Sequence, residues 1–296
     1  MRSTVVEPTG FIRASFARVR SRVARPRVVM AVVAALATST ACTSRDRAAS
    51  MSAASGEPVT VFAAADLRFA LADVARLYRE QGGDSLVLVF GSTGDLTTQI
   101  INGAPADLFF AANAQAIDSL ASRSMIVDST RRVYALGRLA LIARCPTTRL
   151  ASQTAGARCP APARLEDVAA PTVQSIAIAD PAHAPYGLAA RQTLERAGLW
   201  KAVEKRIVLG ANVSQAYQFV STGNADVGLV ALSLVARDTV LAHTLVDASL
   251  HDPLRQTVAV MAASTHQGAA VKFLAFLETP AAKEAMHGFG FDEDPR

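Results

Sequence analysis

The sequence predicts an α/β fold made of two lobes with a cleft between them. From Pro58 onward, short apolar runs alternate with amphipathic stretches of helical spacing, a pattern typical of strands followed by helices. The alternation occurs in two sets, and two long apolar stretches, at 134–145 and 254–263, connect them. Hydrophobic residues make up 51% of the 296 residues, enough for two lobes with cores of their own. The expected organisation is lobe 1 at 57–136 and 255–296, and lobe 2 at 137–254.

The first set alternates strands with helices. Strands are expected at 59–65, 85–91 and 106–112, and helices over 67–80, from 92–95 to about 101, and over 114–122. Asp66 stands at the N-cap position of the first helix, and Gly82-Gly83 follow its last turn as a stop signal.

The second set repeats this order. Strands are expected at 175–180, 205–210 and 226–232, with helices near 187–198 and 214–222. The stretch 134–145 is predicted to be one long strand that leaves the first set, and 254–263 a strand that returns to it. Residues 267–291 form a closing helical region.

The charge distribution disfavours a nucleic-acid ligand. The chain carries a formal net charge of +5, with 30 basic and 25 acidic residues. Seven of the arginines and one acidic residue lie in 1–41. The remaining 23 basic and 24 acidic residues leave 42–296 with a net charge of −1, which gives a polyanion no basic surface.

The first 41 residues predict a secretory signal peptide. An arginine-rich start precedes an apolar run at 28–41, too short to span a bilayer as a helix. Ser39-Thr40-Ala41-Cys42 resembles the lipobox of bacterial lipoproteins, with Ser39 where an aliphatic residue is usual. We expect Cys42 to be lipidated and 42–56 to be a flexible tether. The alternative is an ordinary signal peptide with a chance cysteine.

Cys145 and Cys159 are the other two cysteines. In an exported protein they predict a disulfide, closing a loop of about 15 residues and contributing roughly 3 kcal/mol in the chain-entropy model. Two free thiols are the alternative. The C-x13-C spacing fits neither a redox motif nor a zinc site, and the five histidines show no metal-binding spacing. No cation site is predicted.

Three strand-to-helix junctions carry the candidate chemistry: 65–67, 91–94 and 212–214. Each places backbone N–H groups and small or hydroxyl side chains at a helix start, where unpaired amides and the helix dipole favour anions. In open α/β sheets ligands bind beyond the carboxyl ends of strands, where these junctions lie. The residues therefore predict an anion site and leave the anion unidentified.

Four segments resemble signature segments of periplasmic molybdate-binding proteins of ABC uptake systems: VFAAADLRFAL, FGSTGDLTTQIINGAPADLFFAA, IADPAHAPYG and LGANVSQAYQFV. NGAPADLFFAA, at 102–112, is the most specific piece, and the similarity extends over about 58–292. AAADL, PYG and ALS together resemble one branch of that family. The resemblance implies a type II periplasmic binding protein with two crossing hinge strands. It also implies molybdate or tungstate in the interlobe cleft, no cofactor, a monomer, and an ABC permease of the inner membrane as partner.

The resemblance also implies a set of ligand-binding residues. Asp66 takes the place of a serine in the familiar AAAS version, and Thr93, beside Ser92, matches a second hydroxyl position. Tyr186 and Val213 match backbone donors from the other lobe. A tyrosine that helps in some members falls at Ala231, so its role is lost or taken over, with Tyr186 as a candidate.

Asp66 is the main departure from the family, because a carboxylate facing a dianion is repelled. The favoured hypothesis folds its side chain back as the N-cap of helix 67–80. In the other, Asp66 is protonated and donates to an oxo group of the anion, its pKa raised by the neighbouring negative charge.

Two other functions stay open. One is a binding protein for another small anion, such as sulfate, phosphate or a carboxylate. The other is a hydrolase that uses Ser92 or Ser214, for which the sequence offers no convincing base. The prediction is a binding protein without catalysis, outside the cytoplasm and anchored through Cys42.

Overall fold

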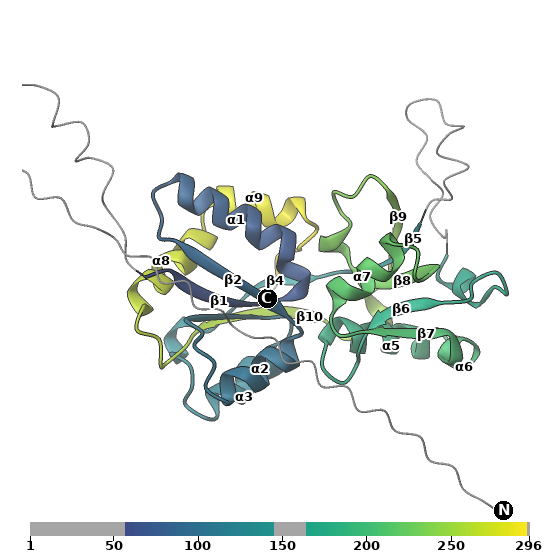
Figure 1. Ribbon diagram of the computed structural model, residues 1–296, viewed down its shortest axis with the longest axis horizontal. Coiled ribbons are helices and arrows are strands. Elements are labelled where there is room, and N and C mark those ends of the chain that lie inside the picture. Colours follow the sequence, from purple (N-terminus) through teal and green to yellow (C-terminus); the bar gives the residue numbers. More distant parts are fainter. Residues whose placement is uncertain (1–56, 145–163, 295–296) are drawn as a thin grey trace, which may run out of the picture. The chain divides into compact units, whose positions relative to one another are not determined.

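The computed structural model of the chain describes residues 57–144 and 164–294. The predicted signal peptide and tether, Cys42 and the Cys145–Cys159 pair lie outside these residues. Two five-stranded mixed sheets organise the described chain (Figure 1). In the part of the chain that the structure describes, no helix is long and apolar enough to cross a membrane.

The first sheet has the strand order β2-β1-β3-β10-β4. Its strands are β1 (Val59–Ala64), β2 (Leu86–Gly91), β3 (Leu108–Ala111), β4 (Arg132–Gly137) and β10 (Leu254–Val260). β1 pairs in parallel with β2 and β3, whereas β10 runs antiparallel to β3 and β4. The carboxyl ends of β1, β2 and β3 therefore meet at one edge, the edge where ligands collect in such sheets.

Helices cover both faces of this sheet. They are α1 (Arg68–Glu80), α8 (Gln267–Leu277) and α9 (Pro280–Gly288) on one face, and α2 (Thr93–Ile101) and α3 (Ala114–Ala121) on the other (Figure 1). Because successive strand residues point to opposite faces, Phe110 packs with the first group and Phe109 with the second. Burial on both faces explains why β3 is wholly apolar and β1 almost so.

The second sheet repeats the pattern, with the order β7-β6-β8-β5-β9. Its strands are β5 (Leu139–Arg144), β6 (Ile176–Ala179), β7 (Ile207–Gly210), β8 (Val227–Ala231) and β9 (Leu241–Leu245). β6 is parallel to β7 and β8, and β5 is antiparallel to β8 and β9. Helices α5 (Pro185–Arg196), α6 (Trp200–Val203) and α7 (Val213–Ser221) accompany this sheet. We call the two sheets with their helices lobe 1 and lobe 2.

The predicted long strand at 134–145 is wrong as a single element. It is broken at Arg138 into β4, which pairs with β10 in the first sheet, and β5, which pairs with β8 and β9 in the second. The chain crosses between the lobes here, as expected, and returns through β10. A run of apolar residues does not reveal that its two halves have different partners, and β9 was not predicted at all.

The helix start expected at 92–95 and the helix stop expected at Gly82-Gly83 are both confirmed. The Ser92 Oγ accepts a hydrogen bond from the Asp95 amide (3.2 Å), so Ser92 caps α2. Gly82 follows α1 with a φ of 80°, a conformation that favours glycine and stops the helix.

Candidate functional site

A small cavity lies where the carboxyl ends of parallel strands from both lobes meet. All its lining residues belong to strand ends or helix starts: Ala64, Ala65, Asp66, Gly91, Ser92, Thr93, Ala112, Ala184, Pro185, Tyr186, Asn212 and Val213. The five residues that the sequence nominated for an anion are all among them. The cavity measures about 10 Å³, room for a single water molecule. A larger anion therefore requires the lobes or side chains around it to move apart.

Three helices begin at the cavity. Thr93 is the first residue of α2, Val213 is the first of α7, and Tyr186 is the second of α5. The first N–H groups of a helix have no intrahelical acceptor, and the positive end of each helix dipole lies at the same place. Helix starts from both lobes thus offer amide donors and positive potential without a charged side chain.

Two hydroxyl groups add to this set. Ser92 accepts from the Asp95 amide, as described, and Thr93 Oγ1 accepts from the Ala112 amide (3.1 Å). Because a hydroxyl that accepts through its oxygen still has its proton to donate, both side chains are oriented as donors. Both are buried, with 4% and 2% exposure.

The lining residues include no lysine, arginine or histidine. Asp66 is the only lining residue with an ionisable carboxyl group, and it is completely buried in the short 3-10 helix Ala65–Leu67. Burial raises the pKa of Asp66 from 3.8 to about 7, although hydrogen bonds, that of the Tyr186 hydroxyl foremost, act to lower it.

The expectation that Asp66 caps the helix at 67–80 is wrong. Leu67 is the N-cap residue of α1, and neither the 3-10 helix nor α1 has a side-chain cap. The Asp66 Oδ2 instead accepts from Gln256 Nε2 (2.9 Å), and its Oδ1 is buried without a hydrogen-bond partner. Because the 3-10 turn separates Asp66 from the start of α1, its side chain is not placed to cap that helix. It bonds instead to Gln256, 190 positions away in the sequence.

Hydrogen bonds between the lobes surround the cavity. Ser214 Oγ donates to the Ala65 carbonyl (2.9 Å), and Ser233 Oγ donates to the carbonyl of Asp66 (2.7 Å). On another side, the Gly94 amide donates to the His183 carbonyl (2.8 Å), and a Cβ at position 94 would lie 2.7 Å from that oxygen. These bonds close the two lobes over the cavity in the conformation described.

Four residues near the cavity were not predicted as part of the site: Gln256, Ser233, Tyr134 and Gly137. Ser233 is the serine of the ALS segment, so a signal for it was present. Gln256 and Tyr134 lie inside strands, where the sequence shows no more than a polar interruption. Ala231, the position of the family tyrosine, is buried at the end of β8 and is not a lining residue. The Tyr186 hydroxyl lies 3.4 Å from Gln256 Nε2, at the polar side of the site.

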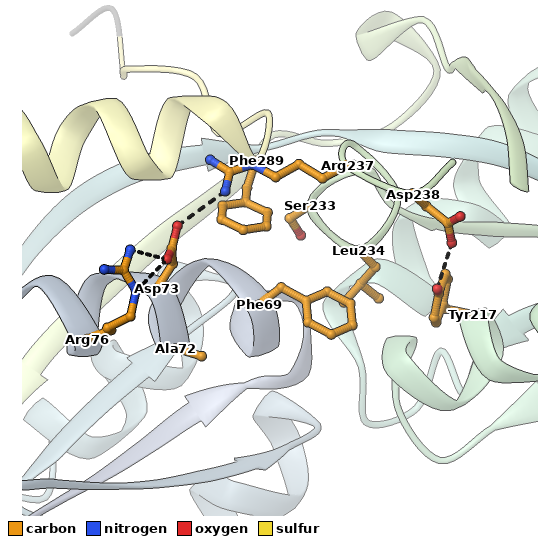
Figure 2. Close-up of a pocket in the computed structure, with 10 residues that line it drawn as sticks. All are labelled: Phe69, Ala72, Asp73, Arg76, Tyr217, Ser233, Leu234, Arg237, Asp238 and Phe289. Atoms are coloured by element: carbon orange, nitrogen blue, oxygen red, sulfur yellow. Dashed lines mark hydrogen bonds and ion pairs between the residues drawn. The ribbon is translucent and has the colours of Figure 1, made fainter. Parts of the chain in front are cut away.

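A much larger cavity, of about 550 Å³, is lined by α1, α7, the segment from Ser233 to Asp238, and Phe289 directly after α9 (Figure 2). Its polar side chains bind one another: Arg237 pairs with Asp73 (3.2 Å), and the Tyr217 hydroxyl donates to Asp238 (2.7 Å). Size usually marks a ligand site. Here we favour the small cavity, because it gathers helix-start amides and two hydroxyls that can still donate their protons, whereas the charged side chains of the large one already pair with one another.

The geometry offers little to a hydrolase. The Ser92 oxygen serves as a helix cap, and the Ser214 hydroxyl donates to a backbone carbonyl. A nucleophilic serine needs a base within hydrogen-bond reach, and neither serine is bonded to a histidine in the hydrogen bonds of the described residues. Nor do those residues contain a group of three or more His, Cys, Asp or Glu side chains placed to hold a metal ion.

The fold and the site together define a solute-binding protein, with two α/β lobes that close on a small interlobe site. The chain belongs to the family of bacterial extracellular solute-binding proteins, whose model matches residues 59–292. Members of this class bind and carry their solutes and are not enzymes.

Within that class the chain is similar to proteins named molybdate-binding protein ModA. The one from Azotobacter vinelandii is 32% identical over 81% of this chain and 91% of its own length. The one from Rhodobacter capsulatus is 31% identical over 81% and 89%. The solved Azotobacter vinelandii periplasmic molybdate-binding protein superposes with a TM-score of 0.71 at 27% identity, covering 80% of this chain and 99% of that one. The resemblance of the four segments is therefore confirmed along the whole described chain.

Proposed function

We propose that this protein captures molybdate, or its analogue tungstate, outside the cytoplasm and delivers it to an ABC permease. The observation that carries the proposal is the cavity at the helix starts. It collects amides of Thr93, Tyr186 and Val213 and the hydroxyls of Ser92 and Thr93 without a basic side chain. Donors that are neutral and fixed suit a small tetrahedral dianion, which has four oxygens to satisfy and no proton to give.

Delivery follows from the arrangement of the lobes. The two crossings, at Arg138 and before β10, are the segments that can bend when the lobes separate. Closure around the anion then brings surfaces of both lobes into one arrangement that a permease can distinguish from the open form. The leader at 1–41 and a lipid on Cys42 belong to the same proposal: the leader would direct export, and the lipid would hold the protein beside the membrane in which the permease lies.

A second candidate, a hydrogen-bearing oxyanion such as hydrogen phosphate, is favoured by one specific residue. An ionised Asp66 about 4 Å from a dianion costs roughly 8 kcal/mol at an effective dielectric constant of about 20. A ligand with its own proton offsets part of this cost by donating a hydrogen bond to the carboxylate.

Calorimetric titration of the purified protein with molybdate, tungstate, sulfate and phosphate tests the proposal. We expect one-to-one binding of molybdate and tungstate, with sulfate silent because its shorter bonds leave the donors out of reach. Silence toward molybdate and tungstate would refute the proposal, and binding of phosphate alone would establish the second candidate. The variant Thr93→Val removes one donor hydroxyl while keeping the side chain's shape, and should bind the anion more weakly.

A further inference from the structure

A buried chain of polar side chains leads away from the anion cavity. Asp66 Oδ2 accepts from Gln256 Nε2 (2.9 Å), and the same nitrogen lies 3.4 Å from the Tyr186 hydroxyl. On the far side the Tyr134 hydroxyl donates to Gln256 Oε1 (3.3 Å). Asp66 and Gln256 have no solvent exposure, and Tyr186 has 2%. The cluster thus joins Asp66 and two strands of lobe 1 to helix α5 of lobe 2.

The backbone is shaped to admit this cluster. The register of β10 against β4 shifts between Gln256 and Thr257, so that Tyr134 has no partner residue in β10. Such a bulge turns side chains away from the regular alternation of a strand. At Gly137 a Cβ would overlap the Tyr186 hydroxyl and lie 2.7 Å from Gln256 Nε2, so only glycine leaves the space.

Within the part of the chain that the structure describes, no cation faces Asp66 to balance an ionised carboxylate. The titratable groups that face it are two hydroxyls, on Tyr186 of α5 and Tyr134 of β4, and burial raises the pKa of Tyr186 well above its ordinary value. Three other elements packed against Asp66 contribute only neutral groups, namely Ser233 after β8, Val213 of α7 and the apolar strand β2. Two nearby elements carry a charge that lies elsewhere: Arg68 of α1 is exposed to solvent, and Arg255 of β10 pairs with Asp294.

The hydrogen bonds also assign the two carboxyl oxygens. An amide nitrogen such as Gln256 Nε2 donates only, so Oδ2 is an acceptor. Oδ1 has no hydrogen-bond partner although it is buried, which is costly for a polar atom. A proton on Oδ1 makes that atom a hydrogen-bond donor. It then matches the amides and hydroxyls of the cavity, which are also donors and suit an anion.

We propose that Asp66 enters the complex as a neutral carboxylic acid whose Oδ1–H donates to an oxygen of the bound anion, so that one proton is captured with each anion. The inference rests on the proposed function and deepens it. When Asp66 is ionised in the free protein, the carboxylate takes its proton from solvent as the dianion binds. No bond of the anion is made or broken.

Two measurable consequences follow. The free carboxyl group is half ionised near pH 7, and a bound dianion raises its pKa further. Affinity therefore falls about tenfold per pH unit above pH 7. The affinity for an anion that brings its own proton does not depend on the protonation of Asp66 in this way. Neutral Asp66 therefore favours fully deprotonated oxyanions at low pH, and the protein loses this preference at high pH, where Asp66 is ionised.

Calorimetry with molybdate on the full chain, from pH 6 to pH 9 and in buffers of different ionisation enthalpy, measures affinity and proton uptake together. We expect affinity about fiftyfold weaker at pH 9 than at pH 7, because half of the carboxyl groups are already ionised at pH 7. Proton uptake should rise toward one proton per anion over the same range. Asp66→Asn keeps a neutral donor and should bind with no uptake and a flat pH profile. Asp118→Asn removes a half-exposed aspartate of α3 that pairs with Arg131 and should retain the wild-type profile.

The outcomes separate the two proposals. Tight binding of molybdate by the wild-type protein with a flat pH profile and no proton uptake would overturn the role of Asp66 and leave the proposed function standing. Absence of molybdate and tungstate binding across the whole pH range would overturn the proposed function, and this inference with it. Since the wild-type protein alone gives proton uptake, the test does not depend on the folding of the Asn variant.

Discussion

The titration of Asp66 predicts how the stability of the unliganded protein depends on pH. Its pKa is about 7 in the folded protein and 3.8 when exposed. A difference of about 3 pKa units corresponds to about 4 kcal/mol. Because the folded state holds the proton more tightly than the unfolded state does, the stabilisation is full below pH 3.8. It is lost progressively as the pH rises through about 7.

Asp66→Asn isolates this contribution, since the amide is neutral at every pH. At about pH 4 the variant and the wild-type protein should differ little. By about pH 8.5 the variant should have gained up to about 4 kcal/mol in unfolding free energy relative to the wild-type protein. Urea unfolding, followed by circular dichroism in buffers without phosphate or sulfate, measures both curves.

Other carboxylates act in a different range of pH. The hydrogen bond with Arg76 lowers the pKa of Asp73, and that with Arg196 lowers the pKa of Asp252. Stability from these exposed pairs is lost as the pH falls below about 4, outside the window that Asp66 occupies. Parallel curves for the variant and the wild-type protein between pH 4 and pH 8.5 would refute the assigned burial and charge of Asp66.

Three further substitutions, one of them with a matched control, test the site and its surroundings. Thr93→Val should weaken molybdate binding about 10- to 100-fold by calorimetry, because a buried donor is lost and the Ala112 amide loses its acceptor; unchanged affinity would remove Thr93 from the site. Gly137→Ala should lower the unfolding free energy by about 1–3 kcal/mol through overpacking. The control Gly268→Ala, in a helix with open space around it, should raise the unfolding free energy by up to about 1 kcal/mol. Equal effects of the two substitutions in urea unfolding would contradict the close packing at Gly137. Arg237→Gln breaks the half-exposed ion pair with Asp73 and should change the unfolding free energy by less than about 1 kcal/mol. Because this pair joins the two lobes, the variant should have a larger radius of gyration in X-ray scattering without anion. An unchanged radius would show that the pair does not hold the lobes together.

Most of the lobe architecture could be predicted from local patterns. The strand at 59–65 and the helix at 114–122 were placed to within about a residue, because a buried parallel strand is continuously apolar and its helix has a 3.6-residue period. The strand predicted at 134–145 failed at Arg138, and β9 was missed. Both errors concern strand partners, which depend on residues far along the chain.

The anion cavity was predictable for a related reason. Strand ends and helix starts are local features, and the topology brings the carboxyl ends of parallel strands to one edge. Ser92, Thr93 and Val213 stand at such junctions, whereas Tyr186 was nominated through the family resemblance. Gln256 could not be nominated, since it reaches the site only through the altered register of β10 against β4.

By itself the sequence determined the α/β class, the two sets of strands and helices, and a site made of helix starts rather than of basic side chains. The tertiary structure alone decided the state of Asp66. Its local sequence favours a helix cap, whereas the folded chain turns it onto Gln256 and buries it away from every cation of the described residues. Capping is a property of neighbouring residues, but the pKa of a carboxyl group depends on the solvent and charges that the whole fold removes or supplies.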